Sequence, residues 1–264
     1  MPEPVSDSLP SITVLLPTFN NEKILKPTLE SIKDADELLV VDSFSTDGTV
    51  ELVTSYGARV IQHVYINSAK QKNWAVPQCR NEWVLQIDSD EVLEPGALDE
   101  IRRSIALAPP EVHCFKMARK NHMLGEWIRF GGIYPDWEHR VFRRDIGRWF
   151  DREVHSNIRV TGEIRTLKSQ ILHYGMPNLS KQIKNLDRYT RYEADELRKK
   201  NRKFSYMKWI VFPWLVFFHR YLWLQGFRDG WRGFFLASYI AFYYFISQSK
   251  LKELEVLKLD KSPS

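Results

Sequence analysis

The chain has 264 residues, of which 44% are hydrophobic and 27% charged, with a formal net charge of +5. This composition excludes wholesale disorder, and the length suits one α/β domain with an appendage, or two small domains. The 2 cysteines cannot form a disulfide framework, and the polar, proline-rich start lacks the basic and apolar parts of a signal peptide. We therefore expect a protein of a reducing compartment that is not secreted.

Aromatic residues and positive charge are concentrated in the C-terminal third. Of the 35 aromatic residues, 18 lie within Phe204–Phe245. Residues 181–203 carry nine Lys or Arg against four Asp or Glu, and residues 204–246 carry four against one. We expect a near-neutral domain over residues 1–177, followed by a helical, basic and aromatic-rich region over residues 178–264.

Strands and helices alternate over the first hundred residues. Short apolar runs rich in β-branched residues predict strands, and apolar residues spaced three and four apart predict helices. The predicted strands are 12–19, 37–42, 59–64 and 83–88, and the predicted helices are 22–32, 49–56, 68–76 and about 95–108. This alternation predicts an α/β fold with a mostly parallel sheet flanked by helices.

The pattern changes after Pro110. The alternation of apolar and polar residues now favours strands without intervening helices. The predicted elements are strands at 112–118 and 137–143, a loop at 121–136 between them, short strands around His155 and Ile171, and a polar helix at 178–203 before the aromatic tail.

Polar residues follow three of the predicted strands at their carboxyl ends. The three clusters are Pro17-Thr18 with Asn20, Asp42-Ser43 with Asp47, and Asp88-Ser89-Asp90. In open α/β sheets, ligands bind outside the carboxyl ends of the strands. The clusters therefore predict a binding site at one edge of the sheet.

The carboxylates of these clusters indicate particular chemistry. Asp88 and Asp90 offer two hard oxygen donors one residue apart, which suit Mg²⁺ or Mn²⁺ bridging the phosphates of a substrate. Asp42 closes its strand where an acid can accept hydrogen bonds from a base or a ribose hydroxyl. Asp47 is interpreted instead as a cap of the following helix. Capping is also the alternative for the other strand-end acids.

Four spaced segments resemble the inverting, nucleotide-sugar-dependent glycosyltransferases of family two, which have the GT-A fold. In order they are ITVLLPTFNNE, ELLVVDSFSTDGT, QKNWA and WVLQIDSDE, and the resemblance covers roughly residues 11–175. It implies a role for each matching residue: Pro17, Thr18, Asn20, Glu22 and Asp42 in the nucleotide pocket, Lys72 and Asn73 beside the uridine-like ring, Asp88 at the ribose or the hydrated metal, and Asp90 as the metal ligand.

A later stretch is similar to one branch of that family, the small bacterial enzymes that add glucose or a similar sugar to the lipopolysaccharide inner core. It comprises GGIYPDWEHRVFRR, EVHSNI, GEIRTL and ILHYG. The branch usually has His-Glu where this chain has His155-Ser156, so the acceptor is left open. His155 and His173 are auxiliary candidates at the diphosphate or the metal, the alternative being structural histidines.

Inverting transfer needs one general base that deprotonates the acceptor hydroxyl. Asp136 lies in the segment where the family carries its base and is our first choice. Glu138 is the second choice, because it shares the face of Asp136 if this segment is a strand. The alternative for both carboxylates is a salt bridge with Arg140 or Arg143.

The aromatic tail favours attachment to an anionic membrane surface. Its longest uncharged stretch, 233–249, has 17 residues, whereas a membrane span needs about 20. Trp and Tyr beside Lys and Arg are typical of interfacial helices. The alternative is a helical hairpin packed against the catalytic domain or a dimer partner, which leaves a homo-oligomer open. Aliphatic runs among the aromatics argue against a nucleic-acid partner.

The resemblance, together with these patterns, implies a metal-dependent, inverting hexosyltransferase that uses Mg²⁺ or Mn²⁺ and a UDP-glucose-like donor. Its acceptor is lipid-linked or part of a lipopolysaccharide core, and it is expected at the cytoplasmic face of the inner membrane, peripheral or monotopic. A nucleotide-sugar-forming nucleotidyltransferase is one alternative, but it would show a Gly-rich basic loop where this chain has PTFNNE. A non-catalytic membrane-binding module is the other, and it would not require acids at three strand ends.

Overall fold

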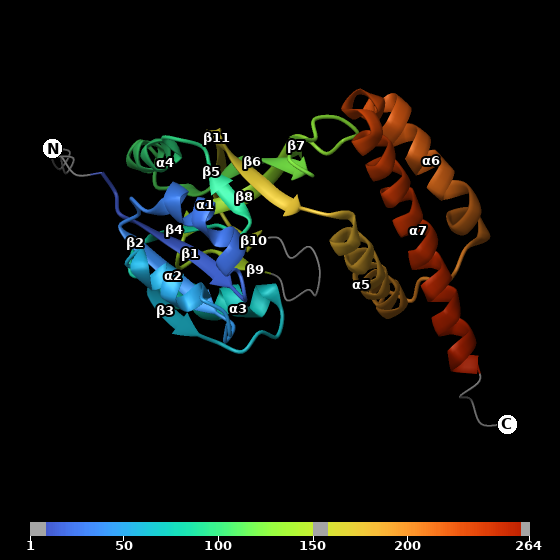
Figure 1. Cartoon of the computed structure of the whole chain (residues 1–264), viewed down its shortest axis with the longest axis horizontal. Helices are drawn as coiled ribbons and strands as arrows, with labels where there is room; N and C mark the ends of the chain where they lie inside the picture. Colours follow the sequence, from blue (N-terminus) through green and yellow to red (C-terminus); the bar gives the residue numbers. More distant parts are fainter. Residues whose placement is uncertain (1–8, 150–157, 260–264) are drawn as a thin grey trace. The chain divides into compact units, whose positions relative to one another are not determined.

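The computed structural model describes residues 9–149 and 158–259 (Figure 1). Two compact units divide the chain. The first comprises the described residues up to Arg119 together with those of Asp136–His173. The second comprises Lys120–Pro135 together with the described residues from Tyr174 onward. The C-terminal helices thus form a unit with a segment from the middle of the chain.

The first unit begins with the predicted alternation of strands and helices. Its elements are β1 (Ile12–Thr18), α1 (Glu22–Ile32), β2 (Glu37–Asp42), α2 (Thr49–Ser55), β3 (Arg59–Gln62), α3 (Ser68–Ala75), the short helix η1 (Val76–Gln78), β4 (Trp83–Gln86), β5 (Glu91–Leu93), α4 (Ala97–Ala106), β6 (Val112–Met123), β8 (Asp136–Arg143), β9 (Arg148–Trp149), β10 (Ile158–Arg159) and β11 (Glu163–Met176). The last residues of β6 and β11 belong to the second unit. Every strand and helix predicted before residue 110 is confirmed, and β5 is an additional strand.

The main sheet is mixed. Its strand order is β3-β2-β1-β4-β8-β6-β11-β5, with β7 pairing with β6. β1 pairs in parallel with β2 and β4, and β2 with β3, whereas β8 runs antiparallel to β4 and β6. The α/β class is confirmed, but the sheet is less parallel than predicted. The reason is that no helix connects the strands that the structure describes between α4 and β11, and parallel neighbours need such a crossover.

Alternate residues of β1 face two hydrophobic cores on opposite sides of the sheet. Ile12, Val14 and Leu16 lie in a core with buried residues of α1, α2 and α4. Leu15 lies in the other core with residues of α3. This alternation follows from the two-residue period of a strand. Helices therefore cover both faces of the sheet.

The second unit is mainly helical. It contains β7 (Glu126–Trp127), α5 (Leu179–Lys199), η2 (Met207–Val211), α6 (Phe212–Phe218), η3 (His219–Trp223), η4 (Gly226–Asp229) and α7 (Gly230–Leu259). α7 packs against both α5 and α6, which lie on either side of it in Figure 1. The predicted polar helix is confirmed as α5, and the aromatic tail folds into a helical hairpin. Over the described residues, no helix combines the length and apolar character that a transmembrane span requires.

Hydrogen bonds attach the middle segment to the start of α7. The Asp229 carboxylate accepts the backbone N–H of Phe130 at 2.8 Å, and Arg232 Nε donates to the Met123 carbonyl at 3.1 Å. The turn before α7 is tight, because a Cβ on Gly233 would lie 1.8 Å from the Gly226 carbonyl oxygen. These contacts explain why residues 120–135 belong to the helical unit.

Candidate active site

The loops after β1 and β2 are tied together by hydrogen bonds. The Thr18 hydroxyl donates to Asp42 Oδ1 at 2.9 Å, and the Ser45 N–H donates to Asp42 Oδ2 at 2.8 Å. The Asn20 N–H donates to Ser45 Oγ at 2.9 Å, and Asn20 Oδ1 accepts the Thr46 N–H at 2.8 Å. Asp42 is fully buried among these contacts. Its carboxylate therefore shapes the loop, and its contact with a nucleotide stays a prediction.

Glu22 and Asp47 join the first turns of α1 and α2. Glu22 Oε2 accepts the Gly48 N–H at 3.1 Å, and a Cβ on Gly48 would lie 2.7 Å from Glu22 Oε1. Asp47 Oδ1 accepts the Thr49 N–H at 3.1 Å. The bonds from Thr49 hold the pKa of Asp47 below its ordinary value. Asp47 is thus a helix cap, as interpreted from the sequence. Pro17, half-buried in β1, lies just upstream of these loops.

Lys72 and Asn73 are neighbours on α3 but have different contacts. Lys72 is buried, and its Nζ donates to Asp88 Oδ1 at 3.1 Å. Asn73 donates Nδ2 to the Trp149 carbonyl and accepts the Trp149 N–H at Oδ1, both at 2.8 Å. Asn73 therefore fixes β9 to α3, whereas Lys72 brings a cation to the end of β4. Contact of either residue with a uridine-like ring stays a prediction.

Asp88, just after the end of β4, is contacted by the side chains of Lys72, Gln86 and Arg140. Gln86 Nε2 donates to Asp88 Oδ1 at 2.8 Å, and Arg140 Nη1 lies 3.6 Å from Asp88 Oδ2. Burial acts to raise the pKa of Asp88, but the cations of Lys72 and Arg140 outweigh it and place the pKa well below its ordinary value. Asp88 is therefore a carboxylate at any physiological pH.

Glu91, fully buried at the start of β5, joins two arginines. Its Oε1 accepts from Arg140 Nη2 at 2.5 Å and lies 3.4 Å from Arg119 Nη1, while its Oε2 accepts the Asp88 N–H at 2.9 Å. Burial alone would lower the pKa of Arg140, but Glu91 and Asp88 raise it above its ordinary value. A buried charge is tolerated only when paired in this way.

Asp90, the metal ligand that the resemblance implies, lies beside His173, and its role stays a prediction. Its carboxylate is partly exposed, and Asp90 Oδ1 lies 3.6 Å from His173 Nε2 on β11. Burial lowers the pKa of His173, against the opposing effect of Glu91 and Asp90, which favours the neutral imidazole. Asp88 is engaged by Lys72 and Arg140, and its side chain is 36% exposed. His155, the other auxiliary candidate, lies outside the described residues.

The donor set suits a metal ion that is shared with a substrate. In the described part of the chain, no group of three or more His, Cys, Asp or Glu is arranged to hold a metal by itself. Mg²⁺ is usually bound by one or two carboxylates together with water and substrate phosphates. The residue that the resemblance implies for this role is Asp90, whose side chain is 23% exposed, and metal binding there stays a prediction.

Both candidate bases lie on β8 and contact one arginine of β6. Arg119 Nε and Nη2 approach Asp136 Oδ2 at 2.9 and 2.7 Å, and Nη2 lies 3.3 Å from Glu138 Oε1. Asp136 and Glu138 thus share a face, as expected. The ion pair weighed as the alternative does form, but its partner is Arg119 rather than Arg140 or Arg143. Those two pair with Glu91 and with Glu82.

One chain of polar contacts joins the predicted metal side and the predicted base. It runs through Lys72, Asp88, Arg140, Glu91, Arg119 and Asp136. Glu91 and Arg119 are members of this chain of contacts that the sequence did not single out, and Arg140 was named only as an ion-pair alternative for the candidate bases. The available signal was a charged residue within an otherwise apolar strand, such as Arg140 before the buried Val141 and Phe142.

Comparison with known proteins identifies the family. The model of glycosyl transferase family 2 matches residues 13–162, which is more than half of the chain. The chain belongs to glycosyl transferase family 2. Family membership and the α/β sheet together confirm the fold class. They favour a glycosyltransferase over the two alternatives, a nucleotide-sugar-forming nucleotidyltransferase and a non-catalytic membrane-binding module.

Relatives of this family-2 chain include one enzyme of lipopolysaccharide core biosynthesis. The lipopolysaccharide core biosynthesis glycosyltransferase LpsC of Rhizobium meliloti is 29% identical over 247 residues, which cover 91% of each chain. An uncharacterized glycosyltransferase of Rickettsia typhi is 26% identical and covers 93% of this chain and 88% of its own. The resemblance to the lipopolysaccharide-core branch is thereby confirmed.

Solved structures similar to the family-2 chain include a mycobacterial protein and a glucosyl-3-phosphoglycerate synthase. The former is 18% identical, with a TM-score of 0.47 and coverage of 66% of this chain and 70% of the other. The latter, from Mycobacterium tuberculosis in complex with Mn²⁺, UDP and phosphoglyceric acid, is 24% identical, with a TM-score of 0.38 and coverage of 42% and 44%.

Proposed function

We propose that this family-2 glycosyltransferase moves a hexose, with inversion, from a UDP-glucose-like donor to a lipid-linked or lipopolysaccharide-core acceptor. The observation that carries the proposal is the unbroken chain of ion pairs between the donor-side carboxylate Asp88 and the proposed base Asp136. This chain of ion pairs links the residue proposed for the nucleotide-diphosphate side to the residue proposed for the acceptor side, which supports the proposal. The lipopolysaccharide-core relative supports the choice of acceptor.

Asp136 is proposed to act as the general base. The acceptor hydroxyl oxygen attacks the anomeric carbon, its proton passes to the Asp136 carboxylate, and the bond from that carbon to the diphosphate oxygen breaks. Arg119 Nε and Nη2 both contact Asp136 Oδ2, and this paired contact fixes the orientation of the carboxylate. Glu91, Asp136 and Glu138 raise the pKa of Arg119 despite its burial, so this cation is permanent.

The donor side is proposed to stabilise the departing diphosphate. Asp90 would hold Mg²⁺ or Mn²⁺, and such an ion supplies positive charge at the phosphates when bound. Lys72 is a second cation at this edge, held by Asp88. Asp42, Asn20 and Glu22 keep the loops after β1 and β2 in the conformation that faces the nucleotide.

We also propose that the enzyme works at the cytoplasmic face of the inner membrane, as a peripheral or monotopic protein. Residues 1–177 would carry the catalysis and residues 178–264 the membrane association. The excess of Lys and Arg over Asp and Glu in the latter region supports attraction to anionic lipids. A lipid-borne acceptor and a surface-bound enzyme are held near each other, which favours their reaction.

Acceptor-dependent release of the nucleotide tests the proposal. The purified enzyme is incubated with Mn²⁺ and a panel of UDP-, GDP- and ADP-sugars, with and without a lipopolysaccharide-core acceptor. We expect UDP release from one UDP-hexose that rises at least tenfold when the acceptor is added. The proposed transfer would be contradicted if none of the nucleotide sugars released its nucleotide, or if the rate of release did not depend on the acceptor.

A further inference from the structure

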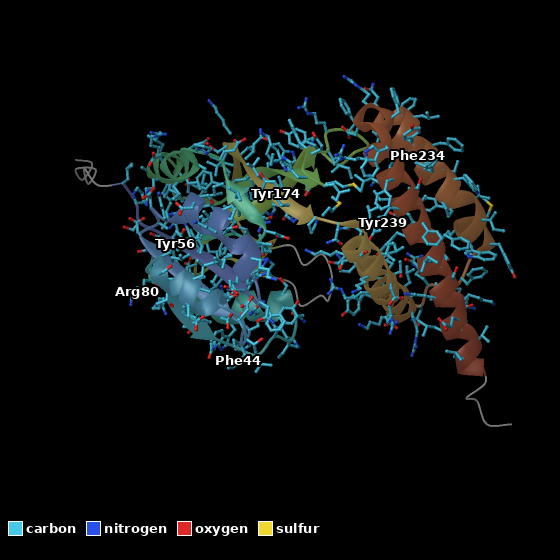
Figure 2. All side chains as sticks on the ribbon, viewed as in Figure 1. Phe44, Tyr56, Arg80, Tyr174, Phe234 and Tyr239 are labelled. Atoms are coloured by element: carbon cyan, nitrogen blue, oxygen red, sulfur yellow. The ribbon has the colours of Figure 1, made fainter. Side chains whose placement is uncertain are left out.

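The helical run from Met207 to Trp223 is apolar on two faces, of which only one is packed. Towards α7, Trp209 stacks on Phe245 with ring centres 5.4 Å apart, and Phe217 meets Phe234 at 5.5 Å (Phe234 is labelled in Figure 2). Pro213 is buried on the same side. These contacts pack one apolar face of the run against α7.

The other face is an outward stripe of large exposed side chains. Its members are Met207, Ile210, Val211, Trp214, Leu215, Phe218, Leu222 and Trp223. Most are spaced three or four residues apart, as expected for one face of a helix. Trp214 is 64% exposed and Trp223 is 79% exposed. At a rise of about 1.5 Å per residue the run is roughly 25 Å long, too short to cross a bilayer but long enough to lie on one.

Cations without carboxylate partners accompany the outward stripe. Lys208, Arg220, Arg228 and Arg232 form no salt bridge with any residue that the structure describes. Arg220 and Arg232 donate to the carbonyls of Gly131 and Met123 and are half-buried, whereas Lys208 and Arg228 are exposed. Asp229, the one acidic residue within residues 204–246, accepts hydrogen bonds from the backbone N–H groups of Arg129 and Phe130.

We propose that the outward stripe is the docking surface for an anionic lipid bilayer. The helix would lie along the surface, with its aromatic and aliphatic side chains at the boundary of headgroups and acyl chains and the exposed cations Lys208 and Arg228 at lipid phosphates. A second copy of the chain is a poorer occupant, because it would bring the same unpaired cations with it. The assignment deepens the proposed attachment to the membrane, and docking can be measured without the reaction.

Co-flotation with vesicles tests the assignment. The variant Trp214→Ser/Leu215→Ser/Phe218→Ser removes three outward side chains and spares the packed face. Wild type is expected to float with vesicles of 30% phosphatidylglycerol in phosphatidylcholine, and the triple variant to bind them at least tenfold more weakly. Binding by wild type is also expected to weaken several-fold when NaCl is raised from 0.1 to 0.5 M, since salt screens the cations.

Matched controls separate the outward stripe from general hydrophobicity. Ile183→Ser removes a 62% exposed residue of α5, and Leu107→Ser removes an 82% exposed residue just after α4. Both are expected to float as wild type does, and circular dichroism verifies that every variant is folded. Unchanged flotation of the folded triple variant would overturn the assignment. So would a wild-type dimer that becomes monomeric in the triple variant, since the stripe would then bind a second copy.

Failure of docking and failure of the proposed function give different results. With a water-soluble core oligosaccharide as acceptor, the triple variant is expected to release UDP at the wild-type rate. An enzyme that turns over but never floats would refute the docking surface alone. An enzyme that floats through this stripe but transfers no sugar would refute the proposed function alone.

Discussion

Charged side chains are paired at the site edge of the sheet, whereas the cations beside the outward stripe of the helical hairpin have no carboxylate partner. At the sheet edge, Asp88, Glu91 and Asp136 each meet a cation, and the guanidinium of Arg119 contacts three carboxylates. Beside the stripe, the exposed cations Lys208 and Arg228 meet no carboxylate of the described chain, and large apolar side chains stay exposed. The charges at the sheet edge are balanced within the protein. The cations without carboxylate partners beside the stripe favour an external anionic partner.

The difference also predicts how each region responds to substitution. Removing one partner of a buried ion pair leaves the other charge uncompensated, so changes at the sheet edge should affect chemistry and sometimes folding. Removing an exposed apolar side chain should hardly affect either one. The following substitutions test this contrast.

Asp136→Asn is expected to have the largest effect, because it removes the proposed base while keeping the side-chain shape. The rate constant kcat should fall about 10³-fold, within the range of 10² to 10⁴ for general bases. Calorimetry should show donor binding within about twofold of wild type. If the variant keeps near-wild-type turnover, Asp136 is not the base, and Glu138→Gln becomes the variant to compare.

Asp90→Ala is expected to weaken metal-dependent binding of the nucleotide sugar about 10- to 100-fold, because the ion loses its protein carboxylate. Titrations of the donor with Mn²⁺ and with EDTA measure the effect. The loss should appear only with Mn²⁺ present. Asp99→Ala, an exposed acid on α4, serves as the control and should bind as wild type does. Equal weakening with and without metal would reject Asp90 as a metal ligand.

Arg119→Ala is expected to lower kcat about 10- to 50-fold with little change in the KM for the donor, because it leaves Asp136 unoriented. Arg119→Lys should restore part of the loss, since Lys supplies the charge without the planar fork. The kinetic constants and the thermal midpoint of both variants decide between roles. A loss of stability that matches the loss of activity, with no rescue by Lys, would indicate a purely structural residue.

Two substitutions in the second unit should separate its packed and exposed apolar groups. Leu236→Ala, at a buried position that packs with Ile128 and Met123, is expected to cost about 2–4 kcal/mol of unfolding free energy. Trp214→Ala, on the outward stripe, should change it by less than about 0.5 kcal/mol. Urea unfolding of both variants measures this. A large cost for Trp214→Ala would show that the outward stripe is packed in solution.

The sequence predicted the first part of the fold because each element there carries a local signal. The apolar runs of β1, β2 and β4 and the spacing in α1 are visible without knowledge of their partners. β5 was missed because it has three residues and begins with the charged Glu91. The loop predicted at 121–136 was partly wrong, since β6 continues to Met123 through polar residues that pair with neighbouring strands.

The site could be predicted only as far as its residues follow strand ends. Asp88, Asp90 and Asp136 have positional signals, but the ion pairs depend on register. Arg119 lies opposite Asp136 because a register shift between Phe115 and Lys116 moves the remainder of β6 along β8. A shift of one residue turns a side chain to the other face, and no local pattern reveals it.

The anomeric configuration of the product tests the central claim most directly. Direct displacement by a hydroxyl that Asp136 activates must invert the anomeric carbon of the donor. The enzyme is supplied with an α-linked UDP-hexose, Mn²⁺ and the core acceptor, and the coupling constant of the product's anomeric proton is measured by NMR. We expect a β-linked product from wild type and no product from Asp136→Asn. An α-linked product would contradict it.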